Sequence, residues 1–519
     1  MDFGSFELNA HMSWFDFLVV AVYLAFMLLI GWVISRKMPN FNEFFIAGRT
    51  MTTPILICTL VSTYYGVDVL FGTSELAYNE GVVAWFGYSR PTYLFFIIAA
   101  FLLTRKLREH NYRSLPDILQ FYYGKKAGVF GAMASFVYSL PSLGLFGLGM
   151  VFKVVFPGPS HLIATHLHME PQKFGAILFG GVALVYTLWG GLWAVAVTDT
   201  VQFVLMCVTL SIAIPLVMGH VGGFDYIAHN LPASFFHAGG DVPIWLIIIY
   251  GATGLTILVD PAFYQRIFAA RNFKMVRNAL LIGILMWSAY DWLVTAGGIL
   301  AAGAVHAGLL PADTHPNAAL LRVVIFALPA GLTGLFLAGV LSAAMSTIDS
   351  YCLVAGGNVV YDIYRPVFNP RASDEQLIRL TKWGVLLSWV LGYVLAFYFE
   401  RLLALWVFMS TLLTSTVIVP IMVGLYYKGR KTKMAGLLSC AFGFVAAISY
   451  YVLLHRLGSQ NEEYGTFIWT FSLFGRSISL WQEYALFFSV PLSAVGFILG
   501  SIFGREIHQP EPDAETVSV

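Results

Sequence analysis

Long apolar runs, separated by short polar segments, follow one another along almost the whole chain. Most of these runs reach about 20 residues, the length that an α-helix needs to cross the hydrocarbon core of a bilayer. The pattern predicts an all-α polytopic membrane protein with about 13 transmembrane helices. The predicted spans are 13–35, 50–75, 84–107, 125–156, 172–189, 190–219, 242–268, 275–306, 321–360, 377–400, 402–427, 434–456 and 482–504.

Composition and charge support a polytopic membrane protein. The 519 residues are 58% hydrophobic and 11% charged, which is too apolar for a soluble protein. Basic residues gather in alternate connecting segments, for example 105–106, 271–277 and 428–433. The positive-inside rule then predicts an external N-terminus and a cytoplasmic C-terminus in the plasma (inner) membrane. We expect a monomer in the lipid bilayer that binds no nucleic acid and is no enzyme, since no nucleotide-binding loop, nucleophile constellation or metal motif occurs.

The segment 343–350 places oxygen-bearing side chains on one face of a membrane helix. Ser346, Thr347 and Ser350 follow Ala343 by three, four and seven residues, and Asp349 borders the same stripe. A hydroxyl can bond to the carbonyl one turn back, whereas a carboxylate in hydrocarbon needs a cation or a partner. This favours a hard cation bound by oxygens at mid-membrane. A helix–helix contact of small residues is the alternative.

Two predicted spans contain helix breakers beside polar groups. Residues 50–75 include Pro54 and Gly66, and residues 242–268 include Pro261. Backbone carbonyls freed at membrane depth are tolerated only where they line a cavity or bind something. Counted from the second span, these are the first and sixth helices of a ten-helix unit, which indicates an inverted-repeat transporter with its site at the midplane. Ordinary kinked helices are the alternative.

Four blocks carry a family resemblance: 44–49, 190–202, 264–271 and 343–364. They resemble the corresponding blocks of the sodium:solute symporter family, which has a LeuT-type fold. The resemblance implies a 5+5 inverted repeat with one leading and two trailing helices. The implied segments are 1–49 (external N-terminus, leading helix and cytoplasmic loop), 50–219 (first repeat), 220–241 (external loop), 242–427 (second repeat), 428–504 (trailing helices) and 505–519 (cytoplasmic tail).

The resemblance also implies sodium (Na+) ligands. For a first sodium these are the carbonyls of Ser62, Tyr65 and Ala343 and the hydroxyls of Ser346 and Thr347. For a second sodium they are Asp199 with the hydroxyls of Ser346 and Ser350. Asp349 stands where certain two-sodium members have serine, so it could strengthen the second site or bind a proton instead. Asp199 could also serve as a structural ion-pair partner.

The sequence gives weaker indications of the residues that face the solute. The candidates are Asp68, Arg90, Tyr138, Ser139, Ser142, Thr253 and Thr256. Arg90 is the lone cation in the outer half of its span, and a guanidinium binds carboxylates through a planar fork, so a carboxylate-bearing or zwitterionic solute is expected. Arg90 could instead snorkel outward or pair with Asp68, which leaves a neutral or cationic solute open. Asp291 has no partner that the sequence identifies.

These features together predict a sodium-coupled secondary active symporter that imports a small organic solute by alternating access. The alternative is a transporter-like membrane sensor or receptor module without strong transport. The short tail after Arg505 argues against that alternative, because signalling of this kind needs a cytoplasmic domain. A channel is a third, weaker option.

Overall fold

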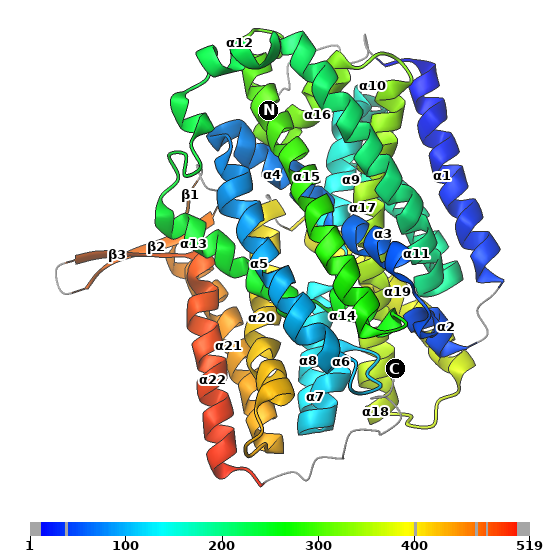
Figure 1. Cartoon of the computed structure of the whole chain (residues 1–519), viewed down its shortest axis with the longest axis vertical. Coiled ribbons are helices and arrows are strands. Elements are labelled where there is room, and N and C mark those ends of the chain that lie inside the picture. Colours follow the sequence, from blue (N-terminus) through cyan, green and yellow to red (C-terminus); the bar gives the residue numbers. More distant parts are fainter. Residues whose placement is uncertain (1–11, 37–39, 399–401, 462–465, 474–475, 506–519) are drawn as a thin grey trace.

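The computed structural model describes residues 12–36, 40–398, 402–461, 466–473 and 476–505. Within them, eleven helices are long and apolar enough to cross a membrane, and a bent pair, α3 with α4, would make twelve. The all-α polytopic class is therefore confirmed, with most helices running along the long axis of the molecule (Figure 1). The count of about 13 stays a prediction. The 51-residue helix α11 contains a non-helical Gly191 (φ 53°, ψ −149°), and its length suffices for two spans.

The first half of the chain forms short and long helices in alternation. Its elements are α1 (Trp14–Ser35), α2 (Phe41–Ile46), η2 (Ala47–Arg49), α3 (Thr53–Tyr64), α4 (Val67–Glu80), η3 (Ala84–Ser89), α5 (Arg90–Ile98), η4 (Ala99–Leu103), α6 (Thr104–Leu107), α7 (Leu115–Tyr123), α8 (Lys125–Tyr138), α9 (Ser142–Val155), α10 (Pro157–His166), α11 (Pro171–Val221), α12 (Gly223–Asn230) and η5 (Ala233–Phe236).

The second half contains the longest buried helix, α17. Its elements are α13 (Ile244–Thr253), η6 (Gly254–Val259), α14 (Pro261–Ala269), α15 (Phe273–His306), α16 (Pro316–Ala327), α17 (Leu332–Gly357), η7 (Asn358–Tyr364), α18 (Arg365–Val367), α19 (Asp374–Ala396), α20 (Leu402–Tyr426), α21 (Lys433–Leu457), β1 (Ser459–Asn461), β2 (Thr466–Leu473), β3 (Arg476–Trp481), η8 (Gln482–Tyr484) and α22 (Ala485–Phe503).

Both predicted interruptions are present. Helix α3 ends before Tyr65, which has a non-helical backbone (φ −97°, ψ 53°), and α4 starts after Gly66. In the other span, η6 is a 3-10 helix that ends at the extended residue Asp260 (ψ 122°). The side chain of Asp260 accepts a hydrogen bond from the Phe263 amide at 2.8 Å and so caps α14. At each break, side chains therefore take the place of helical hydrogen bonds to the backbone.

One predicted span was wrong. The sequence pattern suggested a single span over 321–360, but α16 ends at Ala327 and α17 begins at Leu332. Pro329 disfavours a helical conformation at the residue before it, and Gly331 adopts a positive φ of 87°. The apolar run continues across this turn, which is why hydropathy alone did not separate the two helices.

Backbone hydrogen bonds join the two broken spans. The Met51 amide donates to the Ala269 carbonyl at 3.1 Å, and the Arg271 amide donates to the Met51 carbonyl at 3.1 Å. This short parallel bridge ties the residues just before α3 to those just after α14. These two hydrogen bonds involve main-chain atoms only, and side-chain hydrogen bonds from Arg266 to Thr59 and Thr63 join the same two helices.

Helix α17 lies at the centre of the bundle, almost completely buried, and packs against α11, α19, α1 and α3 (Figure 1). At one side, β1, β2 and β3 form an antiparallel sheet between α21 and α22, with Ser459 opposite Ile468 and Ile468 opposite Trp481. The hydropathy pattern did not predict this sheet, which projects away from the helices. Because α17 is central, its face with the oxygen-bearing side chains of residues 343–350 lies in the interior.

Candidate functional site

The hydroxyls of α17 meet the backbone of the α3–α4 break. Ser346 Oγ donates to the Ser62 carbonyl at 2.9 Å and lies 3.2 Å from the Ala343 carbonyl. Thr347 Oγ1 donates to the Thr63 carbonyl at 3.1 Å and lies 3.1 Å from the Ala343 carbonyl. Four of the five expected first-sodium ligands are thus brought together, all in buried residues. An oxygen-only donor set of carbonyls and hydroxyls suits a hard cation.

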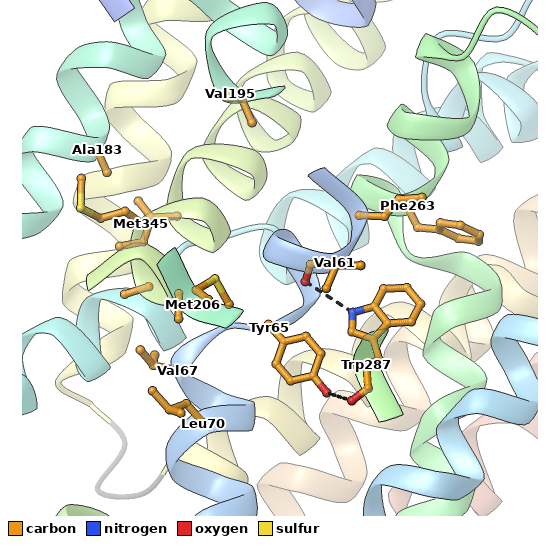
Figure 2. Close-up of a cluster of buried hydrophobic side chains, with 14 of the residues drawn as sticks. Val61, Tyr65, Val67, Leu70, Ala183, Val195, Met206, Phe263, Trp287 and Met345 are labelled. Carbon is orange, nitrogen blue, oxygen red and sulfur yellow. Dashed lines mark hydrogen bonds between the residues drawn. The ribbon is translucent and has the colours of Figure 1, made fainter. Parts of the chain in front are cut away.

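The fifth expected ligand, Tyr65, lies in the break itself, and helix α15 holds it there. The Tyr65 hydroxyl donates to the Trp287 carbonyl at 2.7 Å, and the Trp287 indole N–H donates to the Val61 carbonyl at 3.4 Å (Figure 2). These bonds fix the unwound turn against α15 and leave the carbonyls of Ser62 and Thr63 for α17. Thr63 was not among the expected residues, because the carbonyls that the family resemblance implied were those of Ser62, Tyr65 and Ala343.

A second cluster surrounds the buried guanidinium of Arg266 on α14. Its Nη2 lies 3.6 Å from Asp199 Oδ2, donates to Thr63 Oγ1 at 2.9 Å and also donates to Ser350 Oγ. Asp199 Oδ2 accepts a further hydrogen bond from the Thr59 hydroxyl. Asp199 thus has an ion-pair partner, which was one of the two roles left open by the sequence. Arg266 belongs to a family-like block, but its place in this cluster was not predicted.

Asp349 lies on the opposite side of the same cluster. Its Oδ2 accepts from the Tyr186 hydroxyl at 2.7 Å, and its Oδ1 accepts from Ser350 Oγ at 3.1 Å. Asp349, Asp199 and Arg266 are each 0% exposed. Two carboxylates face one guanidinium, which leaves one formal negative charge if both acids are ionised. A buried charge of this kind is costly unless something neutralises it.

A large cavity adjoins the contact between the α17 hydroxyls and the α3–α4 break. It has a volume of about 1120 Å³, open solvent at its mouth included, and Thr63 and Thr347 belong to its lining. Aromatic rings dominate the walls, and the charged lining residues are Asp260 and Asp291. Among the described residues, no Lys, Arg or His lines it. The cavity therefore combines apolar walls with negative charge, next to the expected sodium ligands.

The predicted solute-facing residues divide into two groups. Tyr138, Thr253 and Thr256 line the cavity, as the sequence analysis expected of them. Ser139 and Ser142 are buried but are not part of the lining, and the Ser142 hydroxyl instead lies 3.3 Å from a methionine sulfur. Pro141 lies between α8 and α9 and interrupts the helix there. Tyr138, Ser139 and Ser142 therefore do not share one helical face.

Arg90 lies outside the cavity lining. Its side chain is exposed, and its guanidinium carbon is 5.4 Å from the ring centre of Trp85 and 5.5 Å from that of Phe86. This geometry corresponds to the outward, aromatic-supported position that the sequence analysis held as an alternative. The side chain of Asp68, its other suggested partner, lies outside the described residues.

Two intramembrane acids received no role from the sequence. Asp260 Oδ2 accepts from the hydroxyls of Tyr138 at 2.9 Å and Tyr351 at 2.8 Å. Asp291 Oδ2 accepts from the Tyr93 hydroxyl, while Asp291 Oδ1 has no hydrogen-bond partner. The available signal was the presence of a carboxylate within a predicted span, which by itself indicates function.

Comparisons with known proteins point to one family. The model of the sodium:solute symporter family matches residues 44–443. The osmoregulated proline transporter OpuE of Bacillus subtilis is 26% identical over 73% of this chain and 76% of its own. The sodium/pantothenate symporter of Escherichia coli is 24% identical over 90% and 92%, and the high-affinity choline transporter 1 of Caenorhabditis elegans is 24% identical over 78% and 70%.

The fold has a solved counterpart. The structure of a Na+-coupled sialic acid symporter, in a substrate-bound outward-open state, superimposes with a TM-score of 0.77. The superposition covers 96% of this chain and 100% of the other, at 16% sequence identity, and therefore concerns the fold. Since the family model spans well over half of the sequence, the chain belongs to the sodium:solute symporter family: it is a multi-pass membrane transporter, not an enzyme, and its coupling ion is Na+.

Proposed function

We propose that this protein imports a small organic solute by alternating access, driven by a sodium ion bound at Ser62, Tyr65, Ala343, Ser346 and Thr347. The observation that carries the proposal is the meeting of two α17 hydroxyls with the carbonyls of the α3–α4 break. An ion at this place bridges two separate elements, so it favours whichever conformation brings them together.

The same contact supports coupling between ion and solute. Thr63 and Thr347 belong both to the hydroxyl–carbonyl contact and to the cavity lining. A cation bound there changes the wall of the cavity, and a solute in the cavity changes the surroundings of the cation. Binding of each then affects the other by the same factor, which is the thermodynamic requirement for symport.

Of the two predicted solute classes, the zwitterionic one fits the cavity better. Asp260 and Asp291 line it, whereas Arg90 does not. A solute with only a carboxylate would meet like charge in an apolar surrounding, which costs several kcal/mol or about a thousandfold in affinity. The relatives do not decide this question, since their names include proline, choline and pantothenate.

A second coupling cation at Asp199, Asp349 and Ser350 is also proposed. Support comes from the charge balance of the cluster, in which, among the described residues, two buried acids face one basic side chain, that of Arg266. Asp199 Oδ1 has no hydrogen-bond partner and can accept a ligand. A sodium ion at these oxygens would remove the excess charge.

Membrane placement follows the sequence analysis. We propose an external N-terminus, a cytoplasmic C-terminus and a functional monomer in the plasma (inner) membrane. Support comes from basic side chains that contact the backbone of neighbouring connecting segments: Arg49 to Tyr112 at 2.9 Å and Lys125 to Pro366 at 3.3 Å. Impermeant maleimide labelling of Lys428→Cys and Gly239→Cys, in a background without the native cysteines, tests the orientation. Labelling of Lys428→Cys from outside would contradict it.

The function itself is tested in proteoliposomes. The purified full chain is exposed to an inward sodium gradient with labelled L-proline, β-alanine, choline or pantothenate outside, and a potassium gradient is the control. We expect accumulation of at least one solute above equilibrium, only with sodium, and its loss when an ionophore collapses the gradient. Equal entry under both gradients would indicate a channel, and no accumulation of any solute would refute symport.

A further inference from the structure

One carboxylate oxygen of Asp291, beside the cavity, is buried and has no hydrogen-bond partner. The residue lies on α15, lines the cavity and is 4% exposed. Its Oδ2 accepts a hydrogen bond from Tyr93, but its Oδ1 has no partner. The hydroxyls of Tyr65 and Ser89 lie near this carboxylate, and that of Tyr65 donates to the Trp287 carbonyl at 2.7 Å. Within the described part of the chain, no ion pair involves Asp291.

The other acid of the cavity has no such opening. Asp260 Oδ1 accepts from the Phe263 amide, and Asp260 Oδ2 accepts from two tyrosine hydroxyls. It also stands at the N-terminus of α14, where the helix dipole favours negative charge. Asp260 is therefore satisfied by the protein, whereas Asp291 is not. A buried acceptor left without a donor costs free energy, so of the two acids Asp291 is the one that can still accept a hydrogen bond from a solute.

We propose that Asp291 binds the protonated amine of the transported solute, with an ammonium N–H donating to its Oδ1. The proposal rests on the proposed symport function and names the chemical class of its solute. A charge-assisted bond of this type is about twice as strong as a neutral hydrogen bond. The proposed solute amine carries at least one N–H, because a quaternary ammonium has no proton to donate to Asp291 Oδ1.

Aromatic rings beside Asp291 suit the same group. Tyr65, Trp287 and Phe96 line the cavity, and the rings of Phe96 and Trp287 stack with centres 4.2 Å apart. The negative face of an aromatic ring attracts a cation, most strongly in a site that excludes water. A solute ammonium would therefore meet one carboxylate and several ring faces, with no competing basic side chain among the described lining residues.

The experiment compares solutes and variants in the sodium-driven uptake assay. The probes are L-proline and β-alanine, which carry a protonated N–H amine, choline, which is quaternary, and pantothenate, which is a carboxylate without an amine. The variants are Asp291→Asn, Asp291→Glu and, as a control for charge loss, Asp225→Asn on the exposed part of α12. Sodium-induced protection against heat is measured for each variant as a readout of folding and ion binding.

We expect accumulation of a solute with a protonated N–H amine and none of pantothenate. Asp291→Asn should raise the solute concentration for half-maximal uptake about 10- to 100-fold while sodium protection persists, since the sodium ligands are intact. Asp291→Glu should recover part of the loss, and Asp225→Asn should match the wild type.

Contrary results separate this inference from the function. Sodium-driven accumulation of pantothenate or choline alone, or amine uptake that is unchanged in Asp291→Asn, would overturn the amine subsite and leave symport intact. If Asp291→Asn does not fold, the wild type still decides: inhibition of uptake by unlabelled amines supports the subsite, and inhibition by pantothenate alone overturns it. Absence of any sodium-driven uptake would overturn both.

Discussion

Removal of a single hydroxyl from α17 offers the sharpest test of the first sodium site. In Ser346→Ala and Thr347→Ala, a cation at the α3–α4 break loses one oxygen ligand. The same changes also remove hydrogen bonds of 2.9 Å to the Ser62 carbonyl and 3.1 Å to the Thr63 carbonyl. The measured effect is therefore a difference between an ion contact and a hydrogen bond.

The magnitude follows from this difference. A contact between a charged group and a neutral oxygen contributes about 1.5–3 kcal/mol, and the hydrogen bond that it replaces contributes about 0.5–1.5 kcal/mol. The net loss is roughly 1–2 kcal/mol, which raises the sodium concentration for half-maximal transport about 5- to 30-fold. Because both hydroxyls contact the Ala343 carbonyl, we expect the double variant to deviate from the sum of the single effects.

The assay is solute uptake at a fixed gradient direction and graded external sodium, with lithium or potassium replacing it. Thr347→Ser keeps a hydroxyl and should stay close to the wild type. Ser489→Ala is a matched control, since that buried hydroxyl donates only to the Ala485 carbonyl of its own helix, α22. An unchanged half-saturation by sodium in both Ser346→Ala and Thr347→Ala would refute the ligand assignment.

Three further predictions address other parts of the molecule. If Asp199 and Asp349 hold a second cation, the ratio of sodium flux to solute flux should fall from about two to about one in either Asn variant, whereas an unaltered ratio makes the acids structural. Arg90→Lys and Arg90→Ala should change the solute concentration for half-maximal uptake less than about twofold, because the side chain is exposed outside the cavity. A loss of solute affinity of about tenfold would instead show that Arg90 contributes to the solute site. Gly191→Ala should lower the free energy of unfolding by more than about 2 kcal/mol, because φ is +53° and the new Cβ would lie 2.3 Å from a backbone oxygen of α2. The measurements are the folded yield and the unfolding temperature. Gly181→Ala, with nothing within 4 Å of its Cβ, is the control, and equal behaviour of the two variants would contradict the steric explanation.

The sequence predicted those parts of the structure that depend on hydropathy and on breakers within one helix. The interruptions at Tyr65–Gly66 and at Asp260 coincide with Gly and Pro, and the face formed by Ser346 and Thr347 follows from helical spacing. The turn at Pro329 was missed because the residues around it are apolar on both sides, so that composition does not change there.

Long-range contacts could not be predicted in this way. The position of Arg266 between Asp199 and Ser350 joins three helices that are distant in sequence. The orientation of Arg90 away from the cavity depends on the π-helical turn η3 just before it, which shifts the facing of the residues that follow. The lack of a hydrogen-bond partner at Asp291 Oδ1 can be recognised only when the surrounding donors are known. The sequence identifies Asp291 as an acid within a span but does not show which of its oxygens accepts a hydrogen bond.

The bridge at Met51 has a mechanical consequence. It consists of main-chain groups alone, so any residue at positions 51 and 271 except proline, which lacks the amide proton, can maintain it. A movement that pulled α3 away from α14 would have to break both hydrogen bonds, at a cost of about 1–3 kcal/mol in total. This main-chain part of the linkage is therefore independent of side-chain identity, whereas the hydrogen bonds from Arg266 to Thr59 and Thr63 depend on it. Sequences of this architecture can diverge at positions 51 and 271 while the two broken spans stay joined by their main chains.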